Sequence, residues 1–302
     1  MNKTLEKAGG LMRRAAIASV SVSLFLVVIK TYAYFASHSV AMLAALADSA
    51  LDLFTSSLNL IAIRSALTPA DDEHRFGHGK AEPLAGLAQG AFITASALFL
   101  VIQAINRILA PEPIDHSVAA LVVMCIAIAA AIALILYQRK VVAKTGSLAV
   151  EADQAHYLGD LAVNVGVVLA LLLTSLLGWT LADPLIAIAV ACVMLFTALG
   201  VGRAAFHQLM DRELPETERA RIFRIARAHP AVKNVHDLKT RMAGLSTFIQ
   251  LHLSLDPKMA LLEAHAISDA VEQALLEAYP GAEVIIHQDP DGLEQVSGAD
   301  AY

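Results

Sequence analysis

Long apolar stretches alternate with short polar connections over the first two thirds of the chain. Six of them approach the roughly 20 apolar residues that a helix needs to cross a bilayer. They lie at about residues 14–36, 40–66, 84–108, 117–138, 148–177 and 180–204. Some connections carry turn-forming residues such as Pro111, Pro113 and Gly178, and others are polar and basic. The pattern predicts an α-helical polytopic membrane domain of six transmembrane helices over residues 1–207.

Beyond about residue 208 the periodicity changes to that of a small soluble domain. The predicted elements are a helix at 215–229, strands at 232–242 and 246–255, a helix at 261–278 and a strand at 283–288. In the second strand Ile249, Leu251 and Leu253 alternate with polar residues, which is typical of a half-buried strand. The order αββαβ predicts an α+β domain over residues 208–290, with its helices on one face of a mixed sheet. Residues 291–302 are predicted to be a disordered tail.

Composition and charge agree with a membrane protein. Hydrophobic residues make up 57% of the 302 residues, which excludes an ordinary soluble domain. Basic residues gather on one side of the predicted helices, at Lys3, Lys7, Arg13, Arg14, Arg64, Arg75, Lys80, Arg139, Lys140, Lys144, Arg203 and Arg212. The positive-inside rule then places both termini in the cytoplasm. We expect a multi-pass membrane protein, with lipid and not nucleic acid around it. The two cysteines, Cys125 and Cys192, both lie in apolar runs and are interpreted as core or lipid-facing residues, which argues against a disulfide framework or a thiolate metal site.

Two pairs of metal-ligand residues lie inside segments that otherwise read as membrane helices. Asp48 and Asp52 belong to the second segment, and His156 and Asp160 to the fifth. Each pair has i,i+4 spacing, so both members share one helix face. A carboxylate near the bilayer centre costs about 2.5–3.5 kcal/mol even on lenient scales. A divalent cation between the two helices supplies the compensating charge.

The predicted shell of three carboxylates and one imidazole suits Zn²⁺, and also Fe²⁺, Co²⁺, Mn²⁺ or Cd²⁺. These ligands also bind protons, so metal binding releases protons. A site exposed alternately to each side would therefore exchange metal for protons. The alternative for these four residues is a set of structural polar contacts or helix caps. No HExxH motif or glutamate poised beside an open metal supports an enzyme.

Two further groups of ligand residues lie outside the predicted membrane segments. Asp71, His74 and His78 fall within eight residues of the loop after the second segment, where they either close round one ion or form a solvated charged loop. The C-terminal domain offers candidates for a mono- or binuclear site, namely His236, His252, His265, His287 and Asp289. His287 and Asp289 share one strand face, because strand side chains alternate.

These residues together resemble the cation diffusion facilitator family, specifically its bacterial YiiP type, the ferrous-iron and zinc efflux members. The stretches that carry the resemblance are ADSALDLFTSSLNLIAIR, PADDEHRFGHGKAEPLAGLAQ, VEADQAHYLGD and EVIIHQDP, and it extends from about residue 11 to 290. One departure is Ala155, where the close relatives carry a bulkier leucine that seals the site.

The resemblance implies a homodimeric metal–proton antiporter with a metallochaperone-like cytoplasmic domain. It implies a transport site at Asp48, Asp52, His156 and Asp160, and a loop site at Asp71, His74 and His78. It implies a binuclear cytoplasmic site at His236, His252, His265, His287 and Asp289, and a salt bridge near the dimer contact between Lys80 and Asp211. The cargo is expected to be Zn²⁺, with Fe²⁺ and Cd²⁺ as alternatives, and no organic cofactor is expected. A membrane metal sensor without transport is the alternative function, but a sensor needs no ligands at mid-bilayer.

Overall fold

The computed structural model of the chain describes residues 3–37, 40–109, 118–177, 179 and 181–292. The chain divides into a helical unit, Ala8–Phe206, and a C-terminal unit, His207–Tyr302 with Met1–Lys7. Each is described by itself below. The predicted turn at 109–116, with Pro111 and Pro113, lies almost wholly outside the described residues. So does the predicted disordered tail beyond Gly292.

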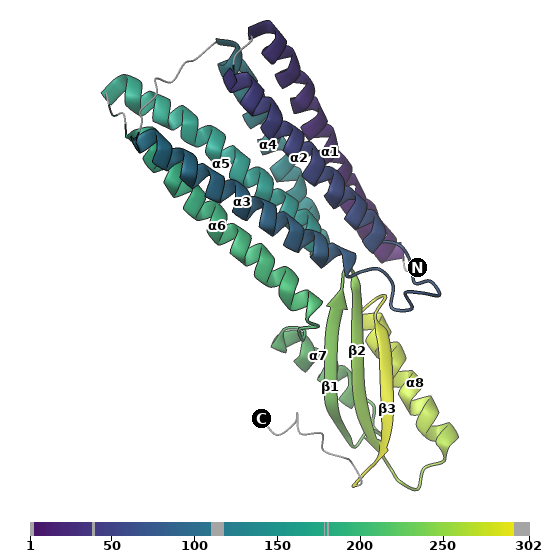
Figure 1. The fold of residues 1–302 in the computed structure, drawn as a ribbon. Helices are drawn as coiled ribbons and strands as arrows, with labels where there is room; N and C mark the ends of the chain where they lie inside the picture. The colour runs from purple at the N-terminus through teal and green to yellow at the C-terminus, as the bar shows by residue number, and fades with distance from the viewer. Residues whose placement is uncertain (1–2, 38–39, 110–117, 178, 180, 293–302) are drawn as a thin grey trace. The chain divides into compact units, whose positions relative to one another are not determined.

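Six long helices form the helical unit (Figure 1). They are α1 (Lys3–Ser37), α2 (Val40–Ala66), α3 (Ala81–Leu109), α4 (Val118–Thr145), α5 (Leu148–Leu177) and α6 (Ala182–Leu209). Among the described residues, five of these helices are long and apolar enough to cross a membrane. The remaining one, α5, carries three acidic residues, Glu151, Asp153 and Asp160. The prediction of a helical membrane domain is confirmed.

The observed helix ends differ from the predicted ones where the chain becomes polar. The fourth helix was predicted to end at residue 138 but continues to Thr145, through Arg139, Lys140 and Lys144. Hydropathy marks only the stretch that fits the hydrocarbon core. Backbone hydrogen bonding can continue beyond it, because each further residue adds one helical hydrogen bond. The basic residues therefore extend the helix past the apolar span.

Small residues allow α6 to approach its neighbours closely. A Cβ atom at Gly166 of α5 would lie 2.9 Å from Cγ2 of Ile186, and one at Gly90 of α3 would lie 3.4 Å from the carbonyl oxygen of Ala198. Membrane helices use such positions because close backbone packing replaces the hydrophobic driving force that lipid removes. Close packing along α6 thereby fixes the faces that α3 and α5 turn toward it.

The C-terminal unit has the predicted αββαβ order. Its elements are α7 (Glu216–Arg227), β1 (Asn234–Ala243), β2 (Ser246–Leu255), α8 (Leu261–Ala278) and β3 (Glu283–Pro290). The sheet has the order β1-β2-β3, with β2 antiparallel to β1 and parallel to β3. The predicted small α+β domain with a mixed sheet is confirmed.

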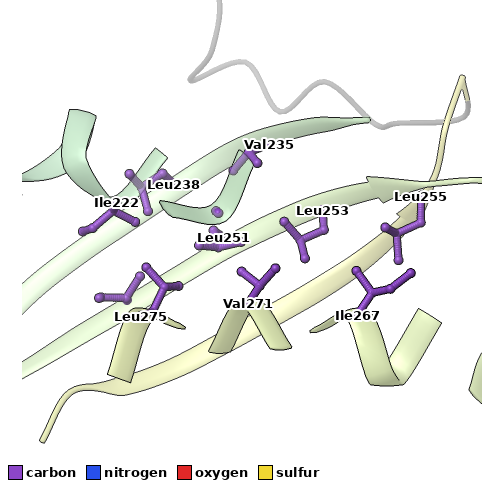
Figure 2. Packing of buried hydrophobic residues seen from close by; sticks show 11 residues of the cluster. Ile222, Val235, Leu238, Leu251, Leu253, Leu255, Ile267, Val271 and Leu275 are labelled. Atoms are coloured by element: carbon purple, nitrogen blue, oxygen red, sulfur yellow. The ribbon is translucent and has the colours of Figure 1, made fainter. Parts of the chain in front are cut away.

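One apolar face of this sheet packs against the helices (Figure 2). Leu251 and Leu253 of β2 are at most 1% exposed and face Val271 and Leu275 of α8. Because successive strand residues point to opposite faces, burial of these leucines turns His252 to the other face. The core thus decides which side chains of the sheet remain available for metal chemistry.

Candidate metal centres

The first candidate centre joins α2 and α5 inside the helical unit. Nε2 of His156 lies 3.1 Å from Oδ1 of Asp52 and 3.6 Å from Oδ2 of Asp160. One ligand atom from each of the three residues lies within 4.8 Å of the other two. His156 and Asp52 are buried, at 5% and 8% exposure. Two helices that are far apart in sequence thus bring an imidazole and two carboxylates to one point.

The chemistry of this donor set fits a cation. Oδ2 of Asp160 is buried and has no hydrogen-bond partner. Buried polar atoms in folded proteins are normally partnered, because an unpaired one costs about 1–3 kcal/mol. A divalent ion between the three side chains would supply the partner and offset two clustered negative charges. Nitrogen and oxygen donors of this kind suit Zn²⁺ and its first-row neighbours.

Asp48, the fourth predicted ligand, differs from the other three. It is exposed and does not belong to the group of ligand atoms within 4.8 Å. Lys30 of α1, which sequence reasoning missed, lies nearby. Its Nζ donates hydrogen bonds to the carbonyl oxygen of Ala45 and, at 2.6 Å, to Oγ of Ser49, the residue after Asp48. The sequence signal for Lys30 was present, because it is a lone charge inside a predicted membrane segment.

A buried polar network lies beside this centre and was also missed. Asp153 of α5 is 1% exposed and accepts hydrogen bonds from Oγ of Ser19 and, at 2.7 Å, from Nε2 of Gln138. The hydroxyl groups of Tyr157 and Ser23 lie 2.6 Å apart. These contacts tie α5 to α1 and α4. They give the neighbours of His156 fixed positions in the bundle.

The second candidate centre is the loop between α2 and α3. Nδ1 of His74 lies 3.4 Å from Oδ1 of Asp71, and Nε2 of His78 lies 3.4 Å from Oδ2 of Asp71. Asp71 also accepts hydrogen bonds from the backbone N–H groups of His74 and Glu73. These N–H groups, that of His74 first, lower the pKa of Asp71 from its ordinary value. The three predicted loop residues therefore lie together, with an ionised carboxylate between two imidazoles.

The third candidate centre lies on the face of the C-terminal sheet opposite its core. His236, His252 and His287 form a row across β1, β2 and β3, since the register pairs His236 with His252 and His252 with His287. Asp289 lies among them, with Oδ2 at 2.8 Å from Nδ1 of His252 and 3.2 Å from Nε2 of His236. Its Oδ1 lies 3.3 Å from Nε2 of His287.

The electrostatics of the third centre favour an ionised Asp289. Partial burial acts to raise its pKa, but the hydrogen bond with His252 and the neighbouring imidazoles outweigh it, so the pKa lies below its ordinary value. Nε2 of His236 is buried without a hydrogen-bond partner. An unpaired imidazole nitrogen beside a carboxylate fits a divalent metal. This set could hold Zn²⁺ through nitrogen and oxygen donors.

A bulge in β1 adds a residue that the sequence pattern did not reveal. The register between β1 and β2 shifts between His236 and Lys239, and Asp237 there has a left-handed φ of 46°. Its Oδ2 lies 3.5 Å from Nε2 of His252. Bulges insert one extra residue and redirect its side chain, so simple alternation cannot place it. Asp237 is therefore a neighbour of the centre that only the structure reveals.

Besides Asp48, three predicted residues are not brought into these groups. His265 lies on α8, is exposed, and has Asp269 as a neighbour, at 3.5 Å. It does not belong to the group formed by His236, His252 and Asp289. Lys80 belongs to the helical unit and Asp211 to the C-terminal unit, where Asp211 lies 3.5 Å from Arg241. The ligand role of His265 and the Lys80–Asp211 salt bridge stay predictions.

Comparison with known families matches both parts of the chain. The family model described as the cation efflux transmembrane domain matches residues 16–210. The model described as the cytoplasmic domain of cation efflux proteins matches residues 214–291. The two matches together cover most of the chain, and the first covers more than half of it.

Full-length relatives match over nearly the whole chain. The cation-efflux pump FieF of Klebsiella pneumoniae is 46% identical over 285 residues, which cover 94% of this chain and 95% of that protein. FieF of Salmonella arizonae is 45% identical over 290 residues, covering 96% and 95%. Among solved structures, the metal-bound C-terminal domain of the CzcD transporter from Thermotoga maritima covers 28% of this chain and 100% of that one, at 28% identity and a TM-score of 0.25.

Proposed function

The chain belongs to the cation efflux family, and from this premise we propose that it exports divalent transition-metal cations from the cytoplasm in exchange for protons. Its several apolar helices make it a multi-pass membrane protein. The resemblance found in the sequence is thereby confirmed at the level of the family. Proteins of this kind are efflux transporters and not enzymes.

The observation that carries the proposal is the group formed by Asp52, His156 and Asp160. It lies between two membrane helices, and its carboxylates would be costly in lipid without a cation. A protein that only sensed cytoplasmic metal would have no use for ligands at that depth. We infer that this group, with Asp48 one turn earlier on α2, is the transport site, and that the exposed Asp48 lies on the route by which the ion enters or leaves.

Proton exchange follows from the same ligands. Metal requires deprotonated carboxylates and a neutral imidazole, so binding a cation releases protons and binding protons releases the cation. Histidine is the side chain that ordinarily titrates within the physiological range. Opening the site first to one side and then to the other would let an inward proton flow drive metal outward.

We propose Zn²⁺ as the main cargo, with Fe²⁺ and Cd²⁺ as alternatives. The relatives are named as cation-efflux pumps, and three nitrogen and oxygen donors within 4.8 Å support a small divalent ion. The loop group of Asp71, His74 and His78 would bind a second ion. We place the protein in the inner membrane of a bacterium, because the relatives that it matches are cation-efflux pumps of Klebsiella and Salmonella. We propose that both termini are cytoplasmic, because the basic residues gather on one side of the predicted helices.

We further propose that the chain works as a homodimer whose C-terminal units bind Zn²⁺ through His236, His252, His287 and Asp289. The cytoplasmic-domain match at residues 214–291 supports a regulatory or dimer-stabilising role for this part. Metal bound there would favour one of two arrangements of the dimer. Rising cytoplasmic metal could then promote its own export.

Zinc flux across proteoliposomes under an imposed pH gradient tests the proposed transport. We expect Zn²⁺ to move in the direction opposite to the proton flow. We expect this movement to stop when an ionophore collapses the pH gradient. Tight Zn²⁺ binding without flux, with or without the gradient, would instead support a membrane metal sensor. Flux that ignores the gradient would contradict proton exchange but not metal transport.

Replacing His156 with aspartate is expected to relax metal selectivity. His156 supplies the only nitrogen ligand of the intramembrane group, and an all-carboxylate site suits harder ions such as Mn²⁺. We expect the ratio of Zn²⁺ to Mn²⁺ transport to fall about tenfold, measured by competition in proteoliposomes. Asn164→Asp, one turn beyond Asp160, adds the same charge outside the group and serves as the control. An unchanged Zn²⁺ preference in His156→Asp would show that selectivity is set elsewhere.

A further inference from the structure

Glu82 is a buried carboxylate that the proposed transport mechanism does not use. It lies in the first turn of α3 and is 2% exposed. Sequence patterning placed it in a polar connection, at the edge of the basic loop before the third membrane segment. A carboxylate so thoroughly removed from water must be compensated, because burying an unpaired charge costs several kcal/mol. Its partners therefore indicate its role.

Those partners belong to the start of α5. Oε1 of Glu82 accepts a hydrogen bond from the backbone N–H of Ala149 at 3.3 Å, and the hydroxyl of Ser147 and the N–H of Leu148 lie close to the same carboxylate. The first N–H groups of a helix have no partner within the helix, and the helix dipole favours an anion there. Oγ of Ser147 in turn accepts a hydrogen bond from the N–H of Val150. A side chain of α3 thus caps α5.

The same residue, Ala149, is also held from α2. Nδ2 of Asn59, which is 5% exposed, donates a hydrogen bond to the carbonyl oxygen of Ala149 at 3.2 Å. Glu82 therefore binds the N–H group of Ala149 and Asn59 binds its carbonyl group, at the start of α5. We call Glu82, Asn59 and Ala149 the α5 clamp.

The α5 clamp and the intramembrane metal centre both lie along the contact between α2 and α5. Asn59 is seven residues after Asp52 on α2, and Ala149 is seven residues before His156 on α5. Seven residues make almost two helical turns, so each pair shares a helix face, about 10 Å apart along the axis. The Asn59–Ala149 and Asp52–His156 contacts therefore fix one antiparallel register of α2 against α5.

We propose that Glu82 is a positioning residue which, through the α5 clamp, holds α5 in the axial register that brings His156 and Asp160 to Asp52. The inference deepens the proposed function and rests on the intramembrane group being the transport site. Sliding α5 by one residue would move its side chains about 1.5 Å along the axis and rotate them by about 100°. Metal–ligand distances tolerate only a few tenths of an ångström, so such a shift would break the donor set.

Zinc affinity of the intramembrane centre tests this role without requiring transport. The measurement is titration calorimetry on the full chain carrying His78→Ala and Asp289→Ala, which removes ligands of the other two centres. We expect Glu82→Ala to raise the Kd for Zn²⁺ about tenfold. Glu82→Gln keeps an oxygen that accepts the same N–H groups, so we expect it to restore the Kd to within about threefold. Asn59→Ala tests the other side of the clamp and should raise the Kd in the same direction.

Glu151→Ala is the matched control. Glu151 is an exposed glutamate in the first turn of α5, so its removal changes the charge at the same helix end without touching the clamp. Equal Kd values for Glu82→Ala and Glu151→Ala would overturn the proposal, as would an unchanged Kd in Asn59→Ala. If Glu82→Ala fails to fold, Glu82→Gln and Asn59→Ala still decide the question.

Flux measurements separate this inference from the proposed function. In proteoliposomes, Glu82→Ala should raise the half-saturating Zn²⁺ concentration about tenfold and change the maximal rate less, whereas loss of folded protein would lower only the maximal rate. That second pattern would overturn the positioning role. A wild-type chain that binds Zn²⁺ with the expected dependence on Glu82 but does not transport it would refute transport and leave the clamp standing.

Discussion

Zinc flux through Asp52→Ala is expected to fall at least about 100-fold relative to the wild-type chain. Asp52 contributes one of three ligand atoms that lie within 4.8 Å of one another. Changing a residue that only hydrogen-bonds to a metal ligand lowers metal affinity or activity by about 10–100-fold, so loss of a direct ligand should cost more. Asp160→Ala should behave in the same way, because it removes the other carboxylate of the group. The measurement is initial Zn²⁺ flux in proteoliposomes under a fixed pH gradient.

The protein itself should survive the substitution of Asp52. Without metal, this residue places a carboxylate in a membrane helix, where its hydrogen bond with His156 is worth about 1 kcal/mol. Its removal also relieves the cost of burying a charge. We therefore expect an unchanged elution volume on size-exclusion chromatography and a similar melting temperature. Asn164→Ala, which removes a polar side chain of α5 that donates to the carbonyl oxygen of Asp160, is the control and should retain flux.

Wild-type rates in Asp52→Ala would contradict the transport site and leave the family assignment intact. In that case Asp48 and Lys30 become the residues to test, since Lys30 donates a hydrogen bond to Ser49, the neighbour of Asp48. If Asp52→Ala loses both flux and folded protein, that variant alone does not distinguish a ligand role from a structural role. Asp52→Asn, which keeps the shape and removes the charge, then decides between a ligand and a structural role.

The intramembrane centre could be predicted because its signal is local to each helix. An i,i+4 pair such as His156 and Asp160 stands out in an apolar segment, whatever the rest of the fold. The contact between Asp52 and His156 spans 104 positions in sequence, and only the shared need of both pairs for a cation pointed to it. The exposure of Asp48 depends on how α2 is rotated in the bundle, which no local pattern encodes.

The residues that support the centres were harder to predict than the ligands. Asp153 lies in an apolar segment and could have been noticed, but its partners Ser19 and Gln138 come from two other helices. Glu82 was read as part of a polar loop because its capping role depends on where α5 begins in space. Asp237 was hidden by the bulge, which breaks the two-residue alternation on which strand predictions depend.

The sheet of the C-terminal unit shows the opposite case, in which alternation predicted the layout well. Leu251 and Leu253 were placed on the inner face and His252 on the outer face, and the structure agrees. The row of three histidines needed one further fact, the register between strands. That register is constrained because a slip of one residue would move the leucines to the solvent face.

Asp289→Ala is expected to lower the Zn²⁺ affinity of the C-terminal unit at least about 100-fold. Asp289 supplies the carboxylate that all three imidazoles share, since its two oxygens lie within 3.3 Å of ring nitrogens of His252, His236 and His287. Its pKa is below the ordinary value, so it carries a full negative charge at neutral pH. Removing it leaves three imidazoles with no anion to offset the charge of a bound cation.

The affinity is best measured by calorimetry on the full chain with Asp52→Ala and His78→Ala, so that the other centres do not contribute. Asp291→Asn is the matched control, because Asp291 is an exposed aspartate two residues farther along the chain. We also expect Zn²⁺ to stabilise the dimer less in Asp289→Ala, seen as a concentration-dependent shift toward monomer in sedimentation experiments. Binding of a ligand to one state stabilises that state by RT ln(1 + [L]/Kd), so a 100-fold weaker site loses up to about 2.7 kcal/mol.

Flux should respond to Asp289→Ala differently from its response to Asp52→Ala. If the C-terminal centre only biases the dimer between two arrangements, its loss changes how flux depends on cytoplasmic Zn²⁺ and leaves the intramembrane ligands able to carry the ion. We expect a reduction of less than about tenfold at saturating Zn²⁺. A complete loss of flux in a variant that remains dimeric would mean that the C-terminal centre takes part in moving the ion, and its role would then have to be reassigned from regulation to transport.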